Sequence, residues 1–352
     1  MLGTQGESRL GDAARPTRVT VGVLTFHRPH HITEVVRAVH DQILALDPSR
    51  FDAQLVVVDN DPGGSASEPV LGLGLSRVRY VIEPTPGIAA GRNRALAEAA
   101  GSHVVLFLDD DGRPGPRWLE LMLEAWLRSR PAAVAGWVDT QHEGPVDAWI
   151  QAGGFFERRR WEDGQLLDAA ACGNLLIDLD QLGTLRFLTG LGLAGGEDTL
   201  LTRQLVARGG RIVFCRDAVV VDIVSTERVT RRWVLIRSLS HGNQGGLLDM
   251  CLSDSPAARL TAGLGGLARI GGGAARAAVG VLGGSQRARA LGARTAMRGV
   301  GMTLAALGLT YNEYARDRSG LRRLARAPEV LRPGNLATTD AAQPGAVVRT
   351  TA

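Results

Sequence analysis

The chain has 352 residues, of which 5 % are aromatic, and 40 basic residues against 36 acidic ones give it a net charge of +4 at pH 7. It contains no lysine, so arginine carries all of the basic side-chain charge. This length allows one large domain or two, and three widely spaced cysteines exclude a disulfide framework and a cysteine metal cluster, which suits a reducing compartment.

The beginning of the chain and its hydropathy predict neither a secretory leader nor a membrane-spanning helix. Residues 1–17 are polar and glycine-rich, so we expect them to be disordered, and no run of about 18 uncharged apolar residues occurs. Residues 328–352 are expected to form a flexible C-terminus. The predicted location is the cytoplasm, with the inner face of the cell membrane as a further candidate.

Residues 18–100 alternate short apolar runs with a helical pattern, which is typical of a parallel α/β sheet. Strands are predicted at 18–26, 54–58 and 78–82, with a helix over 31–45. An alanine-rich helix is expected over 88–101, and arginines near its start suit a phosphate, with solvated surface arginines as the alternative.

Three consecutive carboxylates end the next strand. The apolar run Val104–Leu108 is followed by Asp109, Asp110, Asp111 and Gly112. Ligands of open α/β sheets bind at the carboxyl ends of strands, and three adjacent anions repel one another unless a cation or strong donors neutralise them. The stretch therefore indicates a site for a hard divalent cation such as Mg²⁺, Mn²⁺ or Ca²⁺; a solvated acidic turn is the alternative.

The second half of the chain is less regular. A helix from about residue 116 and a strand at 134–138 precede residues 139–171, an arginine-rich segment predicted to form a mobile loop over the site. A short strand within 172–182 is followed by a glycine-rich loop and a helix that begins near Glu197 and Asp198, where acidic residues also serve as helix caps. Strands are predicted at 212–214 and 218–223, and a helix over 230–239 is expected to break at residues 240–243.

Residues 249–327 are predicted to form a helical, arginine-rich extension. Between residues 259 and 326 there are twelve arginines and only two acids. This composition suits basic amphipathic helices on an anionic membrane surface. Ordinary helices packed on the preceding domain, with a solvated arginine face, are the alternative.

Six segments occur in an order that we associate with a known family: VGVLTFHRP, VVVDNDP, PGIAAGRNRAL, LFLDDDGRPGPRWL, GNLLIDLDQL and GGEDTLLTRQLVARGGRI. Over about residues 20–245 the chain resembles the family-2 glycosyltransferases. The resemblance implies the glycosyltransferase-A fold, an α/β fold with a Rossmann-like, mostly parallel sheet flanked by helices. It implies a catalytic domain over 18–248, with a nucleotide-sugar half at 18–138 and an acceptor half at 139–248.

The resemblance also implies roles for particular residues on the donor side. The residues implied to bind the nucleotide sugar are Thr25, Arg28, Asp59, Arg92, Asn93, Asp109 and Asp110. Asp111 is the implied ligand of a metal, Mg²⁺ or Mn²⁺, that bridges the two phosphates, with Asp109 as a further candidate. Family members usually place a histidine on the strand after the Glu-Asp helix, but this chain has Asp222 at the aligned position. Either Asp222 serves as an oxygen ligand instead, or Asp111, the diphosphate and water hold the metal.

On the acceptor side the resemblance implies that Asp198 is the general base and that Glu197 helps to hold the acceptor. Gly173 and Asn174 match the family's acceptor-side strand. The acceptor hydroxyl must lose a proton as it attacks, which requires one carboxylate. The family's rule is then a single displacement with inversion at the anomeric carbon.

The implied enzyme is a metal-dependent inverting hexosyl- or deoxyhexosyltransferase. Its expected partners are a UDP- or dTDP-type sugar donor and a glycan or lipid-linked acceptor of cell-surface polysaccharide synthesis, with peripheral membrane contact through the basic C-terminal helices. A non-catalytic, nucleotide-sugar-binding or scaffold relative is one alternative. Nucleic acid is not expected as a partner, because the basic tail lacks interleaved aromatic residues.

Overall fold

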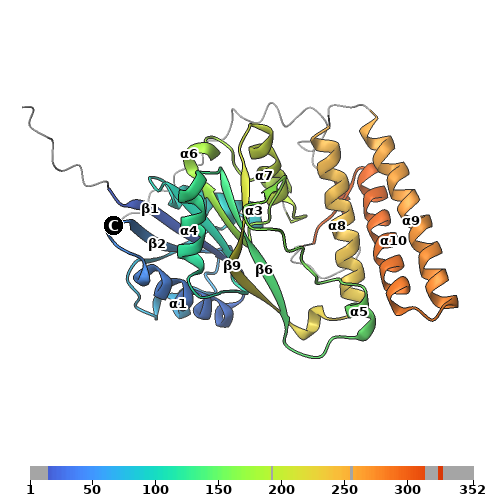
Figure 1. Ribbon diagram of the computed structural model, residues 1–352, viewed down its shortest axis with the longest axis horizontal. Helices are drawn as coiled ribbons and strands as arrows, with labels where there is room; N and C mark the ends of the chain where they lie inside the picture. The colour runs from blue at the N-terminus through green and yellow to red at the C-terminus, as the bar shows by residue number, and fades with distance from the viewer. Residues whose placement is uncertain (1–14, 192, 254–256, 314–323, 328–352) are drawn as a thin grey trace, which may run out of the picture.

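The computed structural model describes residues 15–191, 193–253, 257–313 and 324–327 (Figure 1). The predicted flexible C-terminus, 328–352, lies outside the described residues, as does nearly all of the predicted disordered N-terminus, 1–17. Thr17 already belongs to the first strand.

A mixed sheet forms the centre of the molecule. In the described part of the chain it has nine strands in the order β3-β2-β1-β4-β8-β6-β9-β5, and β7 pairs with β9. The strands are β1 Thr17–Thr25, β2 Phe51–Asp59, β3 Val78–Ile82, β4 Val104–Asp109, β5 Gly112–Pro114, β6 Ala133–His142, β7 Leu166–Leu167, β8 Asn174–Asp178 and β9 Ile212–Val224. Strands β1 to β4 run parallel, β8 is antiparallel to both of its neighbours, and β6 and β9 are parallel again. This is the expected fold class.

Helices cover both faces of this sheet (Figure 1). They are α1 Pro29–Ala45, α2 Ser67–Leu71, α3 Ile88–Glu98, α4 Trp118–Ser129, α5 Ala148–Ala152, α6 Leu179–Leu182, α7 Glu197–Ala207, α8 Arg231–Cys251, α9 Ala258–Leu282 and α10 Gln286–Ala306. Helices α1 and α4 pack into the core on one face, and α3, α6 and α7 pack into the core on the other. Because the central strands are buried on both faces, their sequences are nearly continuous apolar runs rather than alternating ones.

The strand register brings polar side chains to one edge of the sheet. Thr25 at the end of β1 pairs with Asp59 at the end of β2, and the neighbouring Leu24 pairs with Asp109 at the end of β4. Across the sheet, Gly112 of β5 pairs with Asp222 of β9. The site is therefore assembled from segments that are far apart in the sequence.

The prediction that a helix ends at residues 240–243 is wrong, because α8 continues to Cys251. The small residues that suggested a break form a close contact with α10 instead. A Cβ on Gly242 would lie 2.0 Å from the carbonyl oxygen of Arg298. The buried Asn243 side chain donates to the carbonyl oxygen of Leu309 at 2.8 Å and accepts from the amide of Tyr311 at 2.8 Å.

The two strands predicted at 212–214 and 218–223 are one strand, β9, whose pairing with β6 shifts register between Gly136 and Trp137. The polar residues Arg216 and Asp217 fall at that irregularity, which explains why the pattern suggested a gap. The predicted loop over 139–171 contains the end of β6, α5 and β7.

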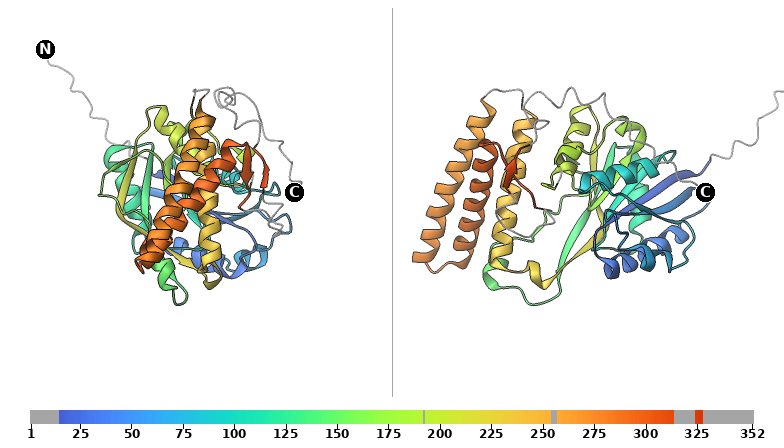
Figure 2. Two further views of the ribbon diagram at one scale, coloured as in Figure 1. Left: turned by 90° about the vertical axis from the view of Figure 1, so that its right-hand side faces the viewer. Right: turned by 180° about the vertical axis from the view of Figure 1, so that it is seen from behind.

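The C-terminal extension is helical, as expected. Figures 1 and 2 show α10 lying between α8 and α9, with α9 on the outside. Helix α9 buries small residues against α10, among them Ala262, Gly266 and Gly273, and exposes Leu260 and Leu264. Within the described residues, no helix combines the length and apolar character that crossing a bilayer requires.

Candidate active site

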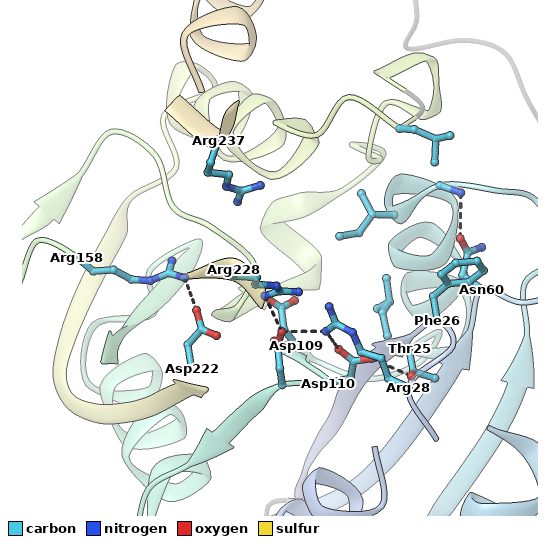
Figure 3. Close-up of a pocket in the computed structure, with 15 residues that line it drawn as sticks. Thr25, Phe26, Arg28, Asn60, Asp109, Asp110, Arg158, Asp222, Arg228 and Arg237 are labelled. Carbon is cyan, nitrogen blue, oxygen red and sulfur yellow. Dashed lines mark hydrogen bonds and ion pairs between the residues drawn. The ribbon is translucent and has the colours of Figure 1, made fainter. Parts of the chain in front are cut away.

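A pocket of about 290 Å³ opens at the edge of the sheet where β1, β2 and β4 end (Figure 3). Its floor is formed by Asp109, Asp110 and Asp111, and Thr25 and Arg28 border it from the end of β1. The pocket lies at the carboxyl ends of parallel strands, where the sequence analysis expects a ligand. Its use as a ligand site stays a prediction.

The three consecutive carboxylates have different surroundings. Asp110 is buried and accepts hydrogen bonds from Thr25 Oγ1 at 2.9 Å and Arg28 Nη1 at 2.7 Å. Asp111 accepts from Arg28 at 2.9 Å and from Arg228 at 3.3 Å, both at Oδ2. Asp110 is therefore an internal anchor that fixes Arg28, whereas Asp111 faces the pocket with its second oxygen still available.

Asp109 points into the pocket, and half of its side-chain surface is exposed. Its only ion pair among the described residues is a long one, 3.8 Å to Arg92. Desolvation at the pocket floor raises the pKa of Asp109, Arg92 offsets part of this effect, and the neighbouring carboxylates add to it. This crowding of negative charge is what a cation would relieve.

Asp222 adds a fourth carboxylate next to these three. The backbone pairing of β5 with β9 sets Asp222 opposite Gly112, and Arg158 donates to Asp222 Oδ2 at 2.8 Å. Its other oxygen, Oδ1, is buried and has no hydrogen-bond partner among the residues that the structure describes. A buried carboxylate oxygen without a donor is the kind of group that a metal ion or a ligand satisfies.

These residues fit a divalent cation only with help from a ligand. Among the described residues, no cluster of three or more histidine, cysteine, aspartate or glutamate side chains could hold a metal ion alone. The free oxygens of Asp111 and Asp222 are hard donors, and Mg²⁺ in nucleotide sites is commonly held by one or two carboxylates together with phosphates. The donor set therefore suits a metal that binds with a diphosphate.

A second acidic pair lies at the start of α7. Glu197 is buried and forms an ion pair with Arg92, whose guanidinium is also buried. Burial would lower the pKa of Arg92, but the acidic groups around it outweigh burial and raise it, so Arg92 stays charged. Burial also raises the pKa of Glu197, which Arg92 opposes. This pair fixes the beginning of α7 against α3.

Asp198 is held differently from Glu197. Its oxygens accept hydrogen bonds from the backbone amides of Thr199, at 2.6 Å, and Cys172, at 3.3 Å. It faces a cavity of about 300 Å³ that Asp109, Asp111 and Asp222 also line. Asp198 is therefore an oriented carboxylate that shares a cavity with the aspartates at the end of β4 and with Asp222.

Gly173 matters because it has no side chain. A Cβ at this position would lie 2.8 Å from Asp109 Oδ2, so any other residue would displace this carboxylate. The glycine thus keeps open the space between Asp109 and Asp198.

Three of the predicted ligand-binding residues have their polar atoms engaged within the protein. Asp59 is fully buried and accepts from Tyr80 Oη at 2.7 Å as well as from two backbone amides. Asn93 exchanges two hydrogen bonds with the backbone of Phe187. Asn174 accepts from Trp118 Nε1 and donates to two carbonyl groups. In this structure each holds a loop or strand in place, and direct ligand contact by any of them stays a prediction.

Other residues of the site were missed by sequence reasoning, notably Arg158, Arg228 and Arg237 (Figure 3). They come from the segment after β6 and from the region of α8, where no motif marks them. The only signal was the row of three arginines within the segment predicted to cover the site, and Arg158, the first of them, does reach the pocket. Asn60 also lines the pocket; its side chain accepts from the amide of Gly87 and donates to two carbonyl groups.

Known proteins resemble this chain in sequence and in fold. The family model described as glycosyl transferase family 2 matches residues 20–178. The succinoglycan biosynthesis protein ExoM of Rhizobium meliloti (strain 1021) is 31 % identical over 236 residues, which are 65 % of this chain and 74 % of ExoM.

Two solved structures are more distant. A crystal structure of GalNAc-T7 with UDP, GalNAc and Mn²⁺ superposes with a TM-score of 0.47 at 16 % identity, covering 69 % of this chain and 52 % of that one. A crystal structure of S. aureus TarS superposes with a TM-score of 0.45 at 18 % identity, covering 63 % of this chain and 40 % of that one. The chain thus spans about half or less of each of these solved proteins.

Proposed function

Because the chain belongs to glycosyltransferase family 2, we propose that it moves a sugar from a nucleotide-diphosphate donor to an acceptor hydroxyl by a single, metal-assisted displacement with inversion. One observation carries this proposal. Asp198 faces the same cavity as Asp109, Asp111 and Asp222, with the two sets of carboxylates on different elements. One group can then act on the donor while the other acts on the acceptor.

On the donor side, charge develops on the leaving β-phosphate as the sugar departs. Arg28 and Arg228 converge on Asp111 Oδ2, so two guanidinium groups are already directed at the place where a diphosphate would lie. A bound Mg²⁺ or Mn²⁺ would supply further charge neutralisation, held by Asp111 and Asp222, with Asp109 as a further candidate. Thr25 and Asp110 hold Arg28 in position.

On the acceptor side, Asp198 is the proposed general base. Backbone N–H groups fix its orientation, and Arg92 approaches it only to 3.8 Å. A carboxylate oriented at the shared cavity can accept a proton from the attacking hydroxyl. Glu197 supports it by tying the start of α7 to Arg92.

The class of acceptor is a proposal by analogy with a relative. The related ExoM is a succinoglycan biosynthesis protein, and we propose that this chain likewise builds a cell-surface polysaccharide, with a UDP- or dTDP-type donor of a hexosyl or deoxyhexosyl group. The rival reading is a non-catalytic relative that binds nucleotide sugar. The presence of both Asp111 and Asp198 favours the enzyme.

We further propose that α9 touches the inner face of the cell membrane. Its outward surface carries Leu260, Leu264, Leu267, Val279 and Leu282, each more than half exposed, while its small residues face α10. An apolar face this extended is unusual on a surface helix. Flotation with anionic vesicles should be lost when Leu264 and Leu267 are both replaced by glutamate. Unchanged flotation of that variant would contradict the contact.

The site itself is tested by thermal shift. A panel of nucleoside diphosphates and their sugars, with and without Mn²⁺, is measured on the wild type, on Asp111→Ala and on the exposed-carboxylate control Asp41→Ala. Ligands that bind only the folded form raise Tm. We expect one nucleotide to stabilise the wild type and the control only when Mn²⁺ is present, and Asp111→Ala to lose this effect. If no nucleotide shifts Tm, the transferase proposal is wrong.

A further inference from the structure

A second cavity, of about 580 Å³, lies beside the donor pocket and is not explained by donor binding. Its walls come from residues 155–158, from α8 and from α10, so it joins the catalytic domain to the C-terminal helices (Figure 1). Five residues line both this cavity and the donor pocket, namely Arg28, Arg158, Asp222, Arg228 and Arg237. A ligand bound in this cavity would therefore lie next to the donor pocket.

Arginine side chains from α8 and α10 gather in this cavity. Arg294 and Arg298 lie one turn apart on α10, and Arg237 enters from α8. Arg237 forms an ion pair with Glu313, and Arg294 donates to the carbonyl oxygens of Gly153 and Gly154 at 3.1 and 2.8 Å. Each of these two arginines therefore has a partner within the protein.

Arg298 does not. No carboxylate among the described residues lies within ion-pairing distance of Arg298, and its Nε is buried with no hydrogen-bond partner. Burial lowers the pKa of Arg298, and the positive charges of Arg294 and Arg269 lower it further. A guanidinium held beside like charges without an anion is costly, unless an anionic ligand completes the cluster.

The lowered pKa of His241 is consistent with the same excess of positive charge. This residue lies on α8 and lines the cavity. Desolvation lowers its pKa, and the positive charges of Arg237, Arg298, Arg294 and Arg158 lower it further. The imidazole is therefore neutral at pH 7 and can accept as well as donate a hydrogen bond.

We propose that this cavity binds the phosphate or diphosphate group of a phosphate-linked acceptor, with Arg298 as its principal contact. Guanidinium groups reach the cavity from α8, from α10 and from the segment at Arg158, and a phosphate offers oxygens in several directions, whereas a carboxylate offers two in one plane. Trp233 lines the same cavity and stacks with Phe156 at 5.8 Å between ring centroids, so an apolar surface for a sugar ring adjoins the basic end. This inference rests on the proposed function, because it names the substrate class of the same enzyme.

Calorimetric titration with inorganic pyrophosphate tests the proposal on the full chain. EDTA is present, so that the metal-dependent donor site does not take up the probe. We expect wild type to bind, Arg298→Gln to bind at least about tenfold more weakly, and Arg298→Lys to be intermediate, since a charged hydrogen bond contributes about 1.5–3 kcal/mol. Arg287→Gln, on the exposed side of the same helix, removes the same charge outside the cavity and should change the affinity less than about twofold.

Each opposite result overturns the proposal. Wild type that does not bind pyrophosphate would contradict it. Equal loss of affinity in Arg298→Gln and Arg287→Gln would contradict it as well. Malonate that binds as tightly as pyrophosphate would contradict the preference for phosphate. Titration with farnesyl diphosphate then distinguishes a lipid-linked acceptor from a soluble one. Tighter binding than pyrophosphate indicates a lipid-linked acceptor, and equal binding indicates a soluble one.

The failure of this inference can be told apart from the failure of the proposed function. Nucleotide stabilisation with Mn²⁺ should be the same in Arg298→Gln as in the wild type, because Arg298 lines the second cavity and not the donor pocket. If nucleotide binds but pyrophosphate does not, only the acceptor inference is wrong. If no nucleotide binds in either protein, the proposed function is wrong as well.

Discussion

The two acidic pairs of the site are built alike. At the end of β4, Asp110 is buried with Arg28 and the next residue, Asp111, faces the pocket; at the start of α7, Glu197 is buried with Arg92 and the next residue, Asp198, faces the cavity. In each pair the first acid anchors an arginine and the second is available to a ligand. In each pair one carboxylate therefore has a structural role and its neighbour is available for catalysis or binding.

The pairs differ in where the arginine lies. The side chain of Arg28 is 34 % exposed and hydrogen-bonds both acids of its pair. The side chain of Arg92 is 5 % exposed, hydrogen-bonds Glu197 and lies 3.8 Å from Asp198. Two guanidinium groups therefore already face Asp111 Oδ2, which suits a phosphate site. Asp198 is oriented by the backbone amides of Cys172 and Thr199 and by the Thr199 hydroxyl, which suits a base. The following predictions test this division.

The largest effect is expected for Asp198→Asn. The amide preserves the size of the side chain but cannot accept the proton of the acceptor, so turnover should fall by about 10²–10⁴-fold, the usual contribution of a general base. Sugar transfer is measured with the donor that the thermal-shift panel identifies. The Mn²⁺-dependent nucleotide shift should persist in Asp198→Asn and be lost in Asp111→Asn. If Asp198→Asn retained full turnover, the assignment of the base would be wrong.

The next effect concerns stability. Arg92→Leu leaves Glu197 buried without a counter-charge and should lower the free energy of unfolding by about 3–5 kcal/mol. Arg28→Gln, at the more exposed pair, should cost only about 1 kcal/mol. Urea denaturation of both variants measures the difference. The double variant Arg92→Leu/Glu197→Leu should recover most of the loss, and equal costs for the two single variants would contradict the distinction between the pairs.

How far the sequence could predict the site depends on the kind of residue. The roles of Asp111 and Asp198 were implied by the resemblance to the family, because the local patterns alone also allowed a solvated turn and a helix cap. The structure brings both residues to one cavity. Asn174 matched the family pattern equally well, yet its side chain is held by Trp118 and two carbonyl groups. No local pattern reveals such long-range hydrogen bonds.

The fold, too, could be predicted only where local sequence patterns decide the structure. The strands up to β4 were predicted within a few residues, because burial on both faces gives continuous apolar runs. The full length of α8 was not predicted. Gly242 and Asn243 have low helix propensity, but here they lie within α8 at a close contact with α10. Arg158 and Arg298 were not recognised as site residues, because an arginine on a surface segment has the same sequence signature whether it faces water or a cavity.

The smallest expected effect is a change in the pH dependence of Tm. It tests whether the second cavity carries an excess of positive charge, unlike the two acidic pairs, in which each arginine has a carboxylate partner. The folded-state pKa of His241 is lowered, while its unfolded value is about 6.5. Below that value the unfolded chain takes up a proton that the folded chain does not, so the stabilising contribution present above about pH 6.5 is lost as the pH falls. Wild type should therefore lose more Tm between about pH 7.5 and about pH 5 than His241→Gln.

Phosphate should reduce this difference between the two proteins. An anion beside Arg298 would oppose the positive charges that lower the pKa of His241, and the folded state would then bind the proton more readily. Tm is measured for both proteins at the two pH values, with sulfate-free buffer as the reference and inorganic phosphate as the addition. If wild type and His241→Gln lost Tm equally without phosphate, the arginines of the cavity would not affect the pKa of His241. The proposed excess of positive charge in this cavity would then be wrong.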